Sequence, residues 1–196
     1  DFHADAALQE NFQSLQAGLA ALLVEARQGS LLHDGMTVVL AGRPNAGKSS
    51  LLNALAKRDS AIVSELPGTT RDIVREQIAI DGMPLHVLDT AGLRACADAI
   101  EAEGVRRAHQ AMTRADRVLL LADDAGENTG SIHALVNELP AVLSVTLLRN
   151  KIDVSGRPPG IRARGETGLP EAALSCRTGA GLDALRAHLK ECMGYE

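Results

Sequence analysis

The sequence has almost no aromatic residues: it contains no tryptophan, one tyrosine and two phenylalanines. The core of the protein therefore has to be aliphatic, and the 45% of residues that are apolar suffice for one domain with some additional material in 196 residues. No apolar run approaches the ~20 residues of a membrane span. The first residues also lack the basic segment that begins a secretory signal. We expect a protein without a membrane contact.

Cysteine is scarce, and positive charge is not in excess. The three cysteines, Cys96, Cys176 and Cys192, are odd in number and lack metal-ligand spacing, which indicates reduced thiols in a cytoplasmic protein. The net charge of −5 argues against a broad nucleic-acid-binding face, because phosphate contacts require clustered Lys and Arg. A small nucleic-acid contact, or a partner protein that supplies the positive charge for one, is compatible with this composition.

A glycine-rich loop, G-R-P-N-A-G-K-S at residues 42–49, is the strongest local signal. An apolar run precedes it at residues 37–41 and a helical pattern follows it, which is the context that a phosphate-binding loop requires. Glycines let backbone N–H groups surround a phosphate, Lys48 can reach the terminal phosphates, and the Ser49 hydroxyl can bind magnesium. The loop predicts a nucleoside triphosphate site.

Four further motifs follow in order along the chain. They are G-T-T-R-D at residues 68–72, D-T-A-G at residues 89–92, N-K-I-D at residues 150–153 and S-C-R at residues 175–177. Asp89 can hold magnesium through water, and the N–H of Gly92 can approach a γ-phosphate. A threonine within 68–72 can complete the magnesium shell, which would make that loop a switch. Each motif is weak alone, but chance does not explain five in this order.

The N-K-I-D motif selects the base. The Asp153 carboxylate can accept two hydrogen bonds from N1–H and the 2-amino group of guanine, and adenine offers no such donor pair. The stem of Lys151 can cover the purine face, and a backbone N–H of the S-C-R segment can reach the guanine O6. These residues predict specificity for guanine nucleotides.

Strand and helix patterns alternate along the chain, which predicts a mostly parallel α/β sheet with helices on both faces. Asp81-Gly82 between two strand patterns is a hairpin signal, so we expect six strands with one antiparallel edge strand. The expected strands cover residues 37–41, 73–80, 85–88, 117–122, 142–148 and 172–175, and the expected helices cover 49–57, 101–113, 131–138 and 181–193. Residues 149–170 read as loops.

The segment before the first strand reads as one amphipathic helix over residues 4–28, which Gly29-Ser30 then interrupts. Its apolar stripe consists of Leu8, Phe12, Leu15, Leu19, Leu22 and Leu23. A nucleotide-binding domain that begins near Met36 does not need this helix. We expect residues 1–34 to be part of a neighbouring helical domain and residues 35–196 to form the nucleotide-binding domain, within a longer protein. The alternative is that the helix packs on the back of the sheet.

The motif set resembles the translation-factor-related class of small Ras-like P-loop GTPases, and the runs at residues 42–53 and 67–72 resemble its Era-like branch. The runs at residues 80–94 and 100–108 are similar to the MnmE (TrmE) family of tRNA-modification GTPases, and this resemblance extends from about residue 36 to residue 196. The leading helix also fits, since in that family the GTP-binding (G) domain is inserted into a helical domain. Cys176 departs from the alanine that is usual at its position.

The resemblance implies a full set of site residues. GTP would be bound by Asn45, Ala46, Gly47, Lys48, Ser49, Ser50, Ser64, Glu65, Leu66, Pro67, Gly68, Thr69, Thr70, Asp89, Thr90, Ala91, Gly92, Asn150, Lys151, Asp153, Ser175, Cys176 and Arg177. Mg²⁺ would be bound by Ser49 and Thr70, and K⁺ by Asn45, Ser64, Leu66 and Thr69. Potassium would occupy the place of an arginine finger.

The residue after D-T-A-G is Leu93, which cannot orient a nucleophilic water as the glutamine of Ras-like proteins does. The resemblance indicates Glu101 as the residue that orients the water. The alternative is that Glu101 is a solvated residue in the first turn of a helix, where the dipole favours a carboxylate. Arg71 and Arg94 are arginine-finger candidates, but they lie in switch segments where arginines often hold loop structure.

The resemblance further implies partners and a biological role. The G domains would form a homodimer in GTP and potassium, and the full protein would modify the wobble uridine of tRNA with the flavoprotein MnmG (GidA). Folate would bind only in a domain outside this chain, and tRNA would be contacted indirectly. The alternatives are a GTP-gated clamp whose hydrolysis only resets it, and a ribosome-assembly or RNA-binding GTPase of the Era-like branch.

Overall fold

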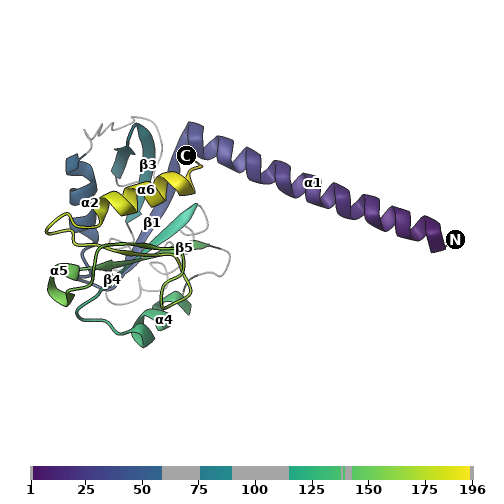
Figure 1. Cartoon of the computed structure of the whole chain (residues 1–196). Coiled ribbons are helices and arrows are strands. Elements are labelled where there is room, and N and C mark those ends of the chain that lie inside the picture. Colours follow the sequence, from purple (N-terminus) through teal and green to yellow (C-terminus); the bar gives the residue numbers. More distant parts are fainter. Residues whose placement is uncertain (1, 59–75, 90–114, 138, 140–142, 195–196) are drawn as a thin grey trace, which may run out of the picture.

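The computed structural model describes residues 2–58, 76–89, 115–137, 139 and 143–194. Seven strands form one sheet in the order β2-β3-β1-β4-β5-β7-β6 (Figure 1). The five central strands are parallel to one another, and an antiparallel strand closes each edge. The expected α/β class with a mostly parallel sheet is confirmed.

Most strands lie where the apolar runs predict them. They are β1 (Met36–Gly42), β2 (Glu76–Ile80), β3 (Met83–Asp89), β4 (Arg117–Asp123), β5 (Ser144–Asn150), β6 (Gly160–Arg162) and β7 (Glu171–Ala173). The expected hairpin joins β2 to β3 through Asp81 and Gly82, both with positive φ, at 50° and 88°. Residues 73–75, the beginning of the expected second strand, lie outside the described residues.

The predicted count of six strands with one antiparallel edge is wrong, because β6 adds a seventh strand and a second antiparallel edge. β6 has only three residues, pairs with β7, and lies in the segment that was expected to form loops. Its residues are half-buried or exposed, so it carries no buried apolar alternation that a sequence pattern could reveal. Pairing with β7 alone creates this strand.

The described helices are α1 (Phe2–Asp34), α2 (Lys48–Arg58), α4 (Thr129–Asn137), α5 (Ile152–Ser155) and α6 (Leu182–Cys192). The predicted end of the first helix at residue 28 is wrong: α1 continues through Gly29 and Ser30 and ends before Gly35, which adopts φ 84°. A Cβ on Gly35 would lie 2.3 Å from the Pro84 carbonyl oxygen, so this turn requires glycine. The expected helix over residues 101–113 lies outside the described residues.

Helices cover both faces of the sheet, as expected (Figure 1). Alternate residues of the strands supply two aliphatic cores: Val38 and Leu40 of β1 face α2 and α6, whereas Val39 and Ala41 face α4. Among the residues that the structure describes, the buried apolar side chains are aliphatic, methionine included, in keeping with the scarcity of aromatic residues. The two cores hold the central parallel strands in register, with their carboxyl ends along one edge.

α1 extends away from the sheet domain (Figure 1). Five large apolar side chains of its stripe, Phe12, Leu15, Leu19, Leu22 and Leu23, are 60–74% exposed. Only the last turns contact the domain: Leu31 packs against the core, and the ring Nε2 of His86 lies 2.9 Å from the Asp34 carbonyl oxygen. The stripe therefore does not pack on the sheet in this structure, and its membership of a helical domain stays a prediction.

Candidate functional site

The glycine-rich loop connects the end of β1 to the beginning of α2 and folds around the side chain of Lys48. The Lys48 ammonium donates hydrogen bonds to the carbonyl oxygens of Gly42 (2.8 Å) and Arg43 (2.9 Å). Gly47 adopts φ 106°, a conformation that side chains rarely allow. Asn45 also lies in the left-handed region with φ 63° and is exposed. The loop thus has the local geometry of a phosphate cradle at the N-terminus of a helix.

Asn150 joins the phosphate loop to the two segments that were predicted to bind the base. Its side chain is buried; Nδ2 donates to the Ala46 carbonyl oxygen (2.8 Å), and Oδ1 accepts from the backbone N–H of Cys176 (3.1 Å). A Cβ on Gly47 would lie 2.2 Å from Nδ2, so the loop can approach Asn150 only with glycine there. Sequence reasoning placed Asn150 in the site but did not predict this bridging contact.

The Asp153 carboxylate lies beside Ser175 and Arg177. Ser175 donates its hydroxyl to Asp153 Oδ1 (2.5 Å), and the Arg177 guanidinium lies 2.5 Å from Oδ2. The hydrogen bond from Ser175 and the charge of Arg177 lower the pKa of Asp153 below its ordinary value. The carboxylate is therefore ionised at neutral pH and can act only as an acceptor, as guanine recognition requires.

Lys151 and Cys176 flank this carboxylate. Lys151 adopts φ 67° and its ammonium lies 2.6 Å from Asp123 Oδ2, a partner that the sequence did not indicate. The hydrogen bond from Lys151 lowers the pKa of Asp123. Burial raises the pKa of the Cys176 thiol to about 11, so this thiol is not reactive at neutral pH. The Cys176 N–H, predicted to reach the guanine O6, donates here to Asn150.

The parallel register places the predicted motifs along one edge of the sheet. Leu40 of β1 pairs with Asp89, whose backbone ends β3, and Asp123 of β4 pairs with Asn150. Ser49 and Ser50 are exposed in the first turn of α2. The remaining predicted site residues lie outside the described residues: Ser64, Glu65, Leu66, Pro67, Gly68, Thr69, Thr70, Thr90, Ala91, Gly92 and the proposed catalytic Glu101. The side chain of Asp89 is likewise not described.

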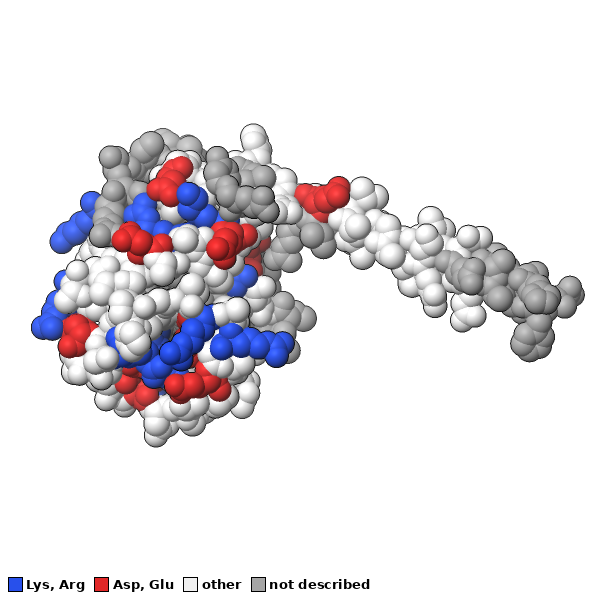
Figure 2. Space-filling model, in the orientation of Figure 1, with Lys and Arg blue, Asp and Glu red and all other residues white. Residues whose placement is uncertain are grey.

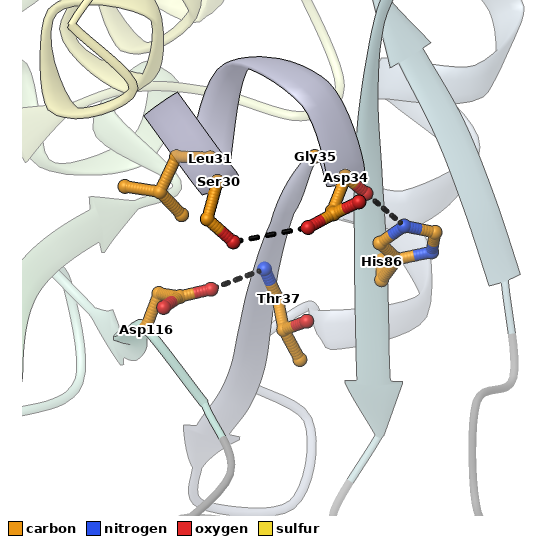
Figure 3. A pocket seen from close by; sticks show the side chains of 7 residues that line it. All are labelled: Ser30, Leu31, Asp34, Gly35, Thr37, His86 and Asp116. Carbon is orange, nitrogen blue, oxygen red and sulfur yellow. Dashed lines mark hydrogen bonds between the residues drawn. The ribbon is translucent and has the colours of Figure 1, made fainter. Parts of the chain in front are cut away.

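A pocket of about 410 Å³ lies at the opposite edge, where α1 meets the amino ends of β1 and β4 (Figure 3). Two hydrogen bonds join residues that line it: Ser30 donates to Asp34, and the N–H of Thr37 donates to Asp116. Within the described ranges, no group of three or more His, Cys, Asp and Glu side chains is placed to hold a metal ion. This pocket lies at the joint between α1 and the sheet domain and is separate from the candidate nucleotide site.

The described surface carries no broad area of one charge on the face shown in Figure 2, where Lys and Arg lie beside Asp and Glu. None of the described helices has the length and apolar character to cross a bilayer.

Curated relatives match this chain over its whole length. Proteins named tRNA modification GTPase MnmE are 53% identical in Pseudomonas savastanoi, 49% in Vibrio cholerae and 48% in Marinobacter nauticus. In each case the match covers 100% of this chain and 44% of the relative. The chain therefore spans less than half the length of these relatives.

Solved structures share the fold. The cytosolic domain of the T. maritima FeoB iron transporter in a GDP form superposes with a TM-score of 0.59 at 27% identity, covering 82% of this chain and 64% of that one. Aquifex aeolicus Era, bound to GDP and aluminium fluoride, superposes with a TM-score of 0.57 at 26% identity, covering 82% of this chain and 56% of that one.

A family model described as 50S ribosome-binding GTPase matches residues 37–151, from the first strand through the lysine of N-K-I-D. The match includes the phosphate loop, the G-T-T-R-D and D-T-A-G motifs and the strands β1 to β5, whereas the S-C-R motif lies beyond it. Because it extends over more than half of the chain, this protein belongs to the family of 50S ribosome-binding GTPases and is a P-loop GTP hydrolase.

Proposed function

We propose that this chain is the GTP-hydrolysing G domain of a cytoplasmic tRNA-modification GTPase, activated by potassium. The observation that carries the proposal is the bridge of Asn150, which holds the phosphate loop beside the loop of Asp153. A phosphate cradle and an ionised guanine acceptor are thereby part of one site. The names of relatives that are about half identical over the whole chain support the link to tRNA modification.

In this proposal each part of the nucleotide has its own residues. Lys48 binds the terminal phosphates, Asp153 accepts the two guanine donors, and Ser49 with Thr70 holds magnesium. Ser49 suits that role because it is exposed in the first turn of α2, next to the cradle. Magnesium, when bound, neutralises charge that develops on the phosphates.

Potassium would be held by Asn45 together with the carbonyl oxygens of Ser64, Leu66 and Thr69. Asn45 suits this role because it is exposed on the phosphate loop, where it adopts a left-handed conformation. A monovalent cation there supplies positive charge near the bond that breaks, as an arginine finger does. Glu101 would orient the attacking water, a role that Leu93 cannot fill.

GTP turnover in potassium and sodium chloride of equal ionic strength tests this proposal. We expect the rate to be at least about tenfold higher in potassium, because developing charge at the transferring phosphate is left uncompensated without it. Glu101→Ala should abolish turnover without weakening GTP binding, and Glu103→Ala, two residues away, is the matched control. Equal rates in both salts would reject potassium activation, and normal turnover of Glu101→Ala would make Glu101 a surface residue.

GTP-dependent dimerisation of G domains would couple hydrolysis to modification of tRNA by the flavoprotein partner MnmG. Mass measurement with GDP and a metal fluoride, in potassium and in sodium, tests the coupling. We expect a dimer in potassium and a monomer in sodium. A monomer in both salts would argue against a dimeric clamp and leave a hydrolase that acts alone.

We further propose that residues 1–34 are part of a neighbouring helical domain of a longer protein, and that folate would bind in a separate domain outside this chain. The five exposed apolar side chains of α1 support this assignment, since such a stripe is normally covered. Deletion of residues 1–33 should leave GDP affinity unchanged. Loss of both nucleotide binding and the thermal transition would show that α1 is integral to the G domain.

A second candidate is a GTPase that acts on the ribosome, which the description of the matching family favours. Cosedimentation of the GTP-bound chain with 50S subunits tests it. Binding to 50S subunits that depends on GTP would support this function over tRNA modification.

A further inference from the structure

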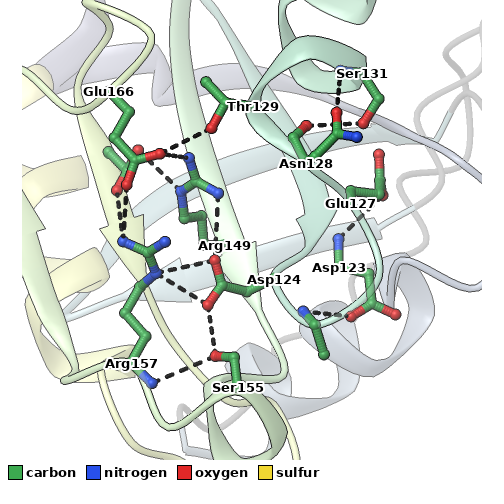
Figure 4. Close-up of polar contacts among 12 residues, drawn as sticks. Asp123, Asp124, Glu127, Asn128, Thr129, Ser131, Arg149, Ser155, Arg157 and Glu166 are labelled. Atoms are coloured by element: carbon green, nitrogen blue, oxygen red, sulfur yellow. Dashed lines mark hydrogen bonds and ion pairs between the residues drawn. The ribbon is translucent and has the colours of Figure 1, made fainter.

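A network of ion pairs adjoins residues 150–155, the segment that contains the N-K-I-D motif and α5 (Figure 4). Its members, here called the Asp124 network, are the guanidinium groups of Arg149 and Arg157 and the carboxylates of Asp124, Glu166 and Glu171. The side chains of Asp124, Arg149 and Glu171 are only 2–3% exposed. Three groups of this kind are rarely buried together unless each is paired, so their arrangement is tightly specified.

Asp124 is the centre of this network. Arg157 Nε lies 2.9 Å from both carboxylate oxygens, Arg149 Nη1 lies 3.3 Å from Oδ1, and the Ser155 hydroxyl donates to Oδ2 at 2.5 Å. Burial alone would raise the pKa of Asp124, but the hydrogen bonds from Ser155 and Arg157 and the two arginine charges outweigh it and lower the pKa. Asp124 is thus an ionised, buried acceptor.

The donors to Asp124 lie on both sides of the base-recognition segment in the chain. Arg149 immediately precedes Asn150, whereas Ser155 ends α5, the short helix that contains Asp153. The backbone N–H of Asp124 also donates to the Asn150 carbonyl oxygen (2.9 Å). One carboxylate therefore holds both ends of the segment that carries the three predicted base-recognition side chains.

Asp123, which precedes Asp124, adds a further contact to the same segment. Asp123, the last residue of β4, accepts a hydrogen bond from the Lys151 ammonium. Asp123 and the next residue, Asp124, together therefore contact Asn150, Lys151 and Ser155. α5 is only four residues long, and no side chain caps its N-terminus. Its position depends on these tertiary contacts more than on its own helical stability.

We propose that Asp124 is a positioning residue for guanine selectivity: through Ser155, Arg157 and Arg149 it sets the distance between the Asp153 carboxylate and the 2-amino group of the base. This inference rests on the proposed role of Asp153 in guanine binding. A hydrogen bond weakens steeply when its donor and acceptor move apart, so a small displacement of α5 loses the contact to the 2-amino group before it abolishes binding.

Inosine diphosphate (IDP) reports this contact, because hypoxanthine has the N1–H of guanine but lacks the 2-amino group. The GDP/IDP affinity ratio, measured by calorimetry on the whole chain, thus measures the placement of Asp153. Asp124→Asn keeps the shape of the side chain and removes its charge. We expect it to lower the ratio about tenfold, with GDP affinity falling more than IDP affinity.

Ser155→Ala is the second variant. Ser155 is exposed, so the substitution leaves the fold intact while it removes one hydrogen bond to Asp124. We expect the ratio to fall in the same direction, by about threefold. Asp81→Asn is the control: Asp81 forms an exposed ion pair with Lys190, remote in sequence from the network, and the ratio should not change.

Asp153→Asn separates this inference from the proposed function. If Asp153→Asn leaves the GDP/IDP ratio unchanged, the assignment of Asp153 to guanine is wrong, and the inference fails with it. If Asp153→Asn lowers the ratio but Asp124→Asn and Ser155→Ala do not, guanine recognition stands and the positioning role of Asp124 is refuted. Should Asp124→Asn fail to fold, the GDP/IDP affinity ratio of Ser155→Ala alone tests the positioning role. A purely structural effect would lower the affinities for GDP and IDP equally and leave the ratio unchanged.

Discussion

Replacement of Asn150 by alanine should destabilise the domain, because this side chain connects three segments that are distant in sequence. Asn150→Ala removes the hydrogen bonds to the Ala46 carbonyl oxygen and from the Cys176 N–H. Each bond contributes about 1 kcal/mol net, and a buried partner left unpaired costs about 1–3 kcal/mol. Ala46 is 1% exposed, so its carbonyl cannot turn to bulk water without loop movement. The expected loss in unfolding free energy is about 2–4 kcal/mol.

Thermal unfolding followed by far-ultraviolet circular dichroism measures this loss. For a domain of this size, 1 kcal/mol corresponds to about 2–4 °C in Tm, so the expected decrease is about 4–16 °C. Asn137→Ala at the exposed end of α4 is the matched control and should change the unfolding free energy by less than about 0.5 kcal/mol. A Tm for Asn150→Ala within about 2 °C of this control would refute the reasoning that these two hydrogen bonds couple the loops.

Three further predictions concern the core, the phosphate loop and acid stability. Leu119→Ala, at a fully buried position of β4, should lower the unfolding free energy in urea by about 2–5 kcal/mol, and a loss below about 1 kcal/mol would mean that the core refills the cavity. Gly47→Ala should abolish GDP binding in calorimetry, because its Cβ would lie 2.2 Å from Asn150 Nδ2 at φ 106°; retained affinity would show that the loop can shift. Asp124 and Glu166 have lowered pKa values in the folded chain, so their stabilisation is present above their unfolded pKa values and is lost as the pH falls through the folded ones. Urea unfolding should therefore show stability that declines below about pH 5 and a smaller decline in Asp124→Asn; identical pH profiles would contradict this.

The outcome for the strands shows where sequence patterns succeed. The central strands have continuous apolar runs, and burial on both faces makes such runs a direct consequence of the fold, so their positions were predicted to within a few residues. β6 could not be predicted, because its three residues carry no apolar pattern and exist as a strand only through pairing with β7. The end of α1 was misplaced because Gly29 and Ser30 weaken a helix without ending it, whereas Gly35 is required by the approach of Pro84.

The candidate site likewise contains residues that local motifs reveal and contacts that only the tertiary fold creates. Lys48, Ser49 and Asp153 could be proposed as site residues from the sequence because each lies in a motif of a few consecutive residues whose backbone conformation those residues themselves favour, and their roles stay predictions. The bridge from Asn150 to Ala46 joins positions that are 104 residues apart, and no local pattern encodes it. Asp123 and Asp124 looked like ordinary residues at the end of a strand until the fold placed Lys151, Ser155 and Arg157 against them.

The sequence by itself thus predicted a phosphate loop, a carboxylate proposed to select guanine, and the mostly parallel, aliphatic sheet that carries both along one edge. Local chemistry is sufficient for these features, since glycine conformations, apolar periodicity and short motifs are properties of short segments. Only the tertiary structure decided which side chains hold the loops in position. Contacts such as Asn150 to Ala46 and Arg157 to Asp124 depend on how distant strands align in register, and the free energy of that alignment is distributed over the whole core.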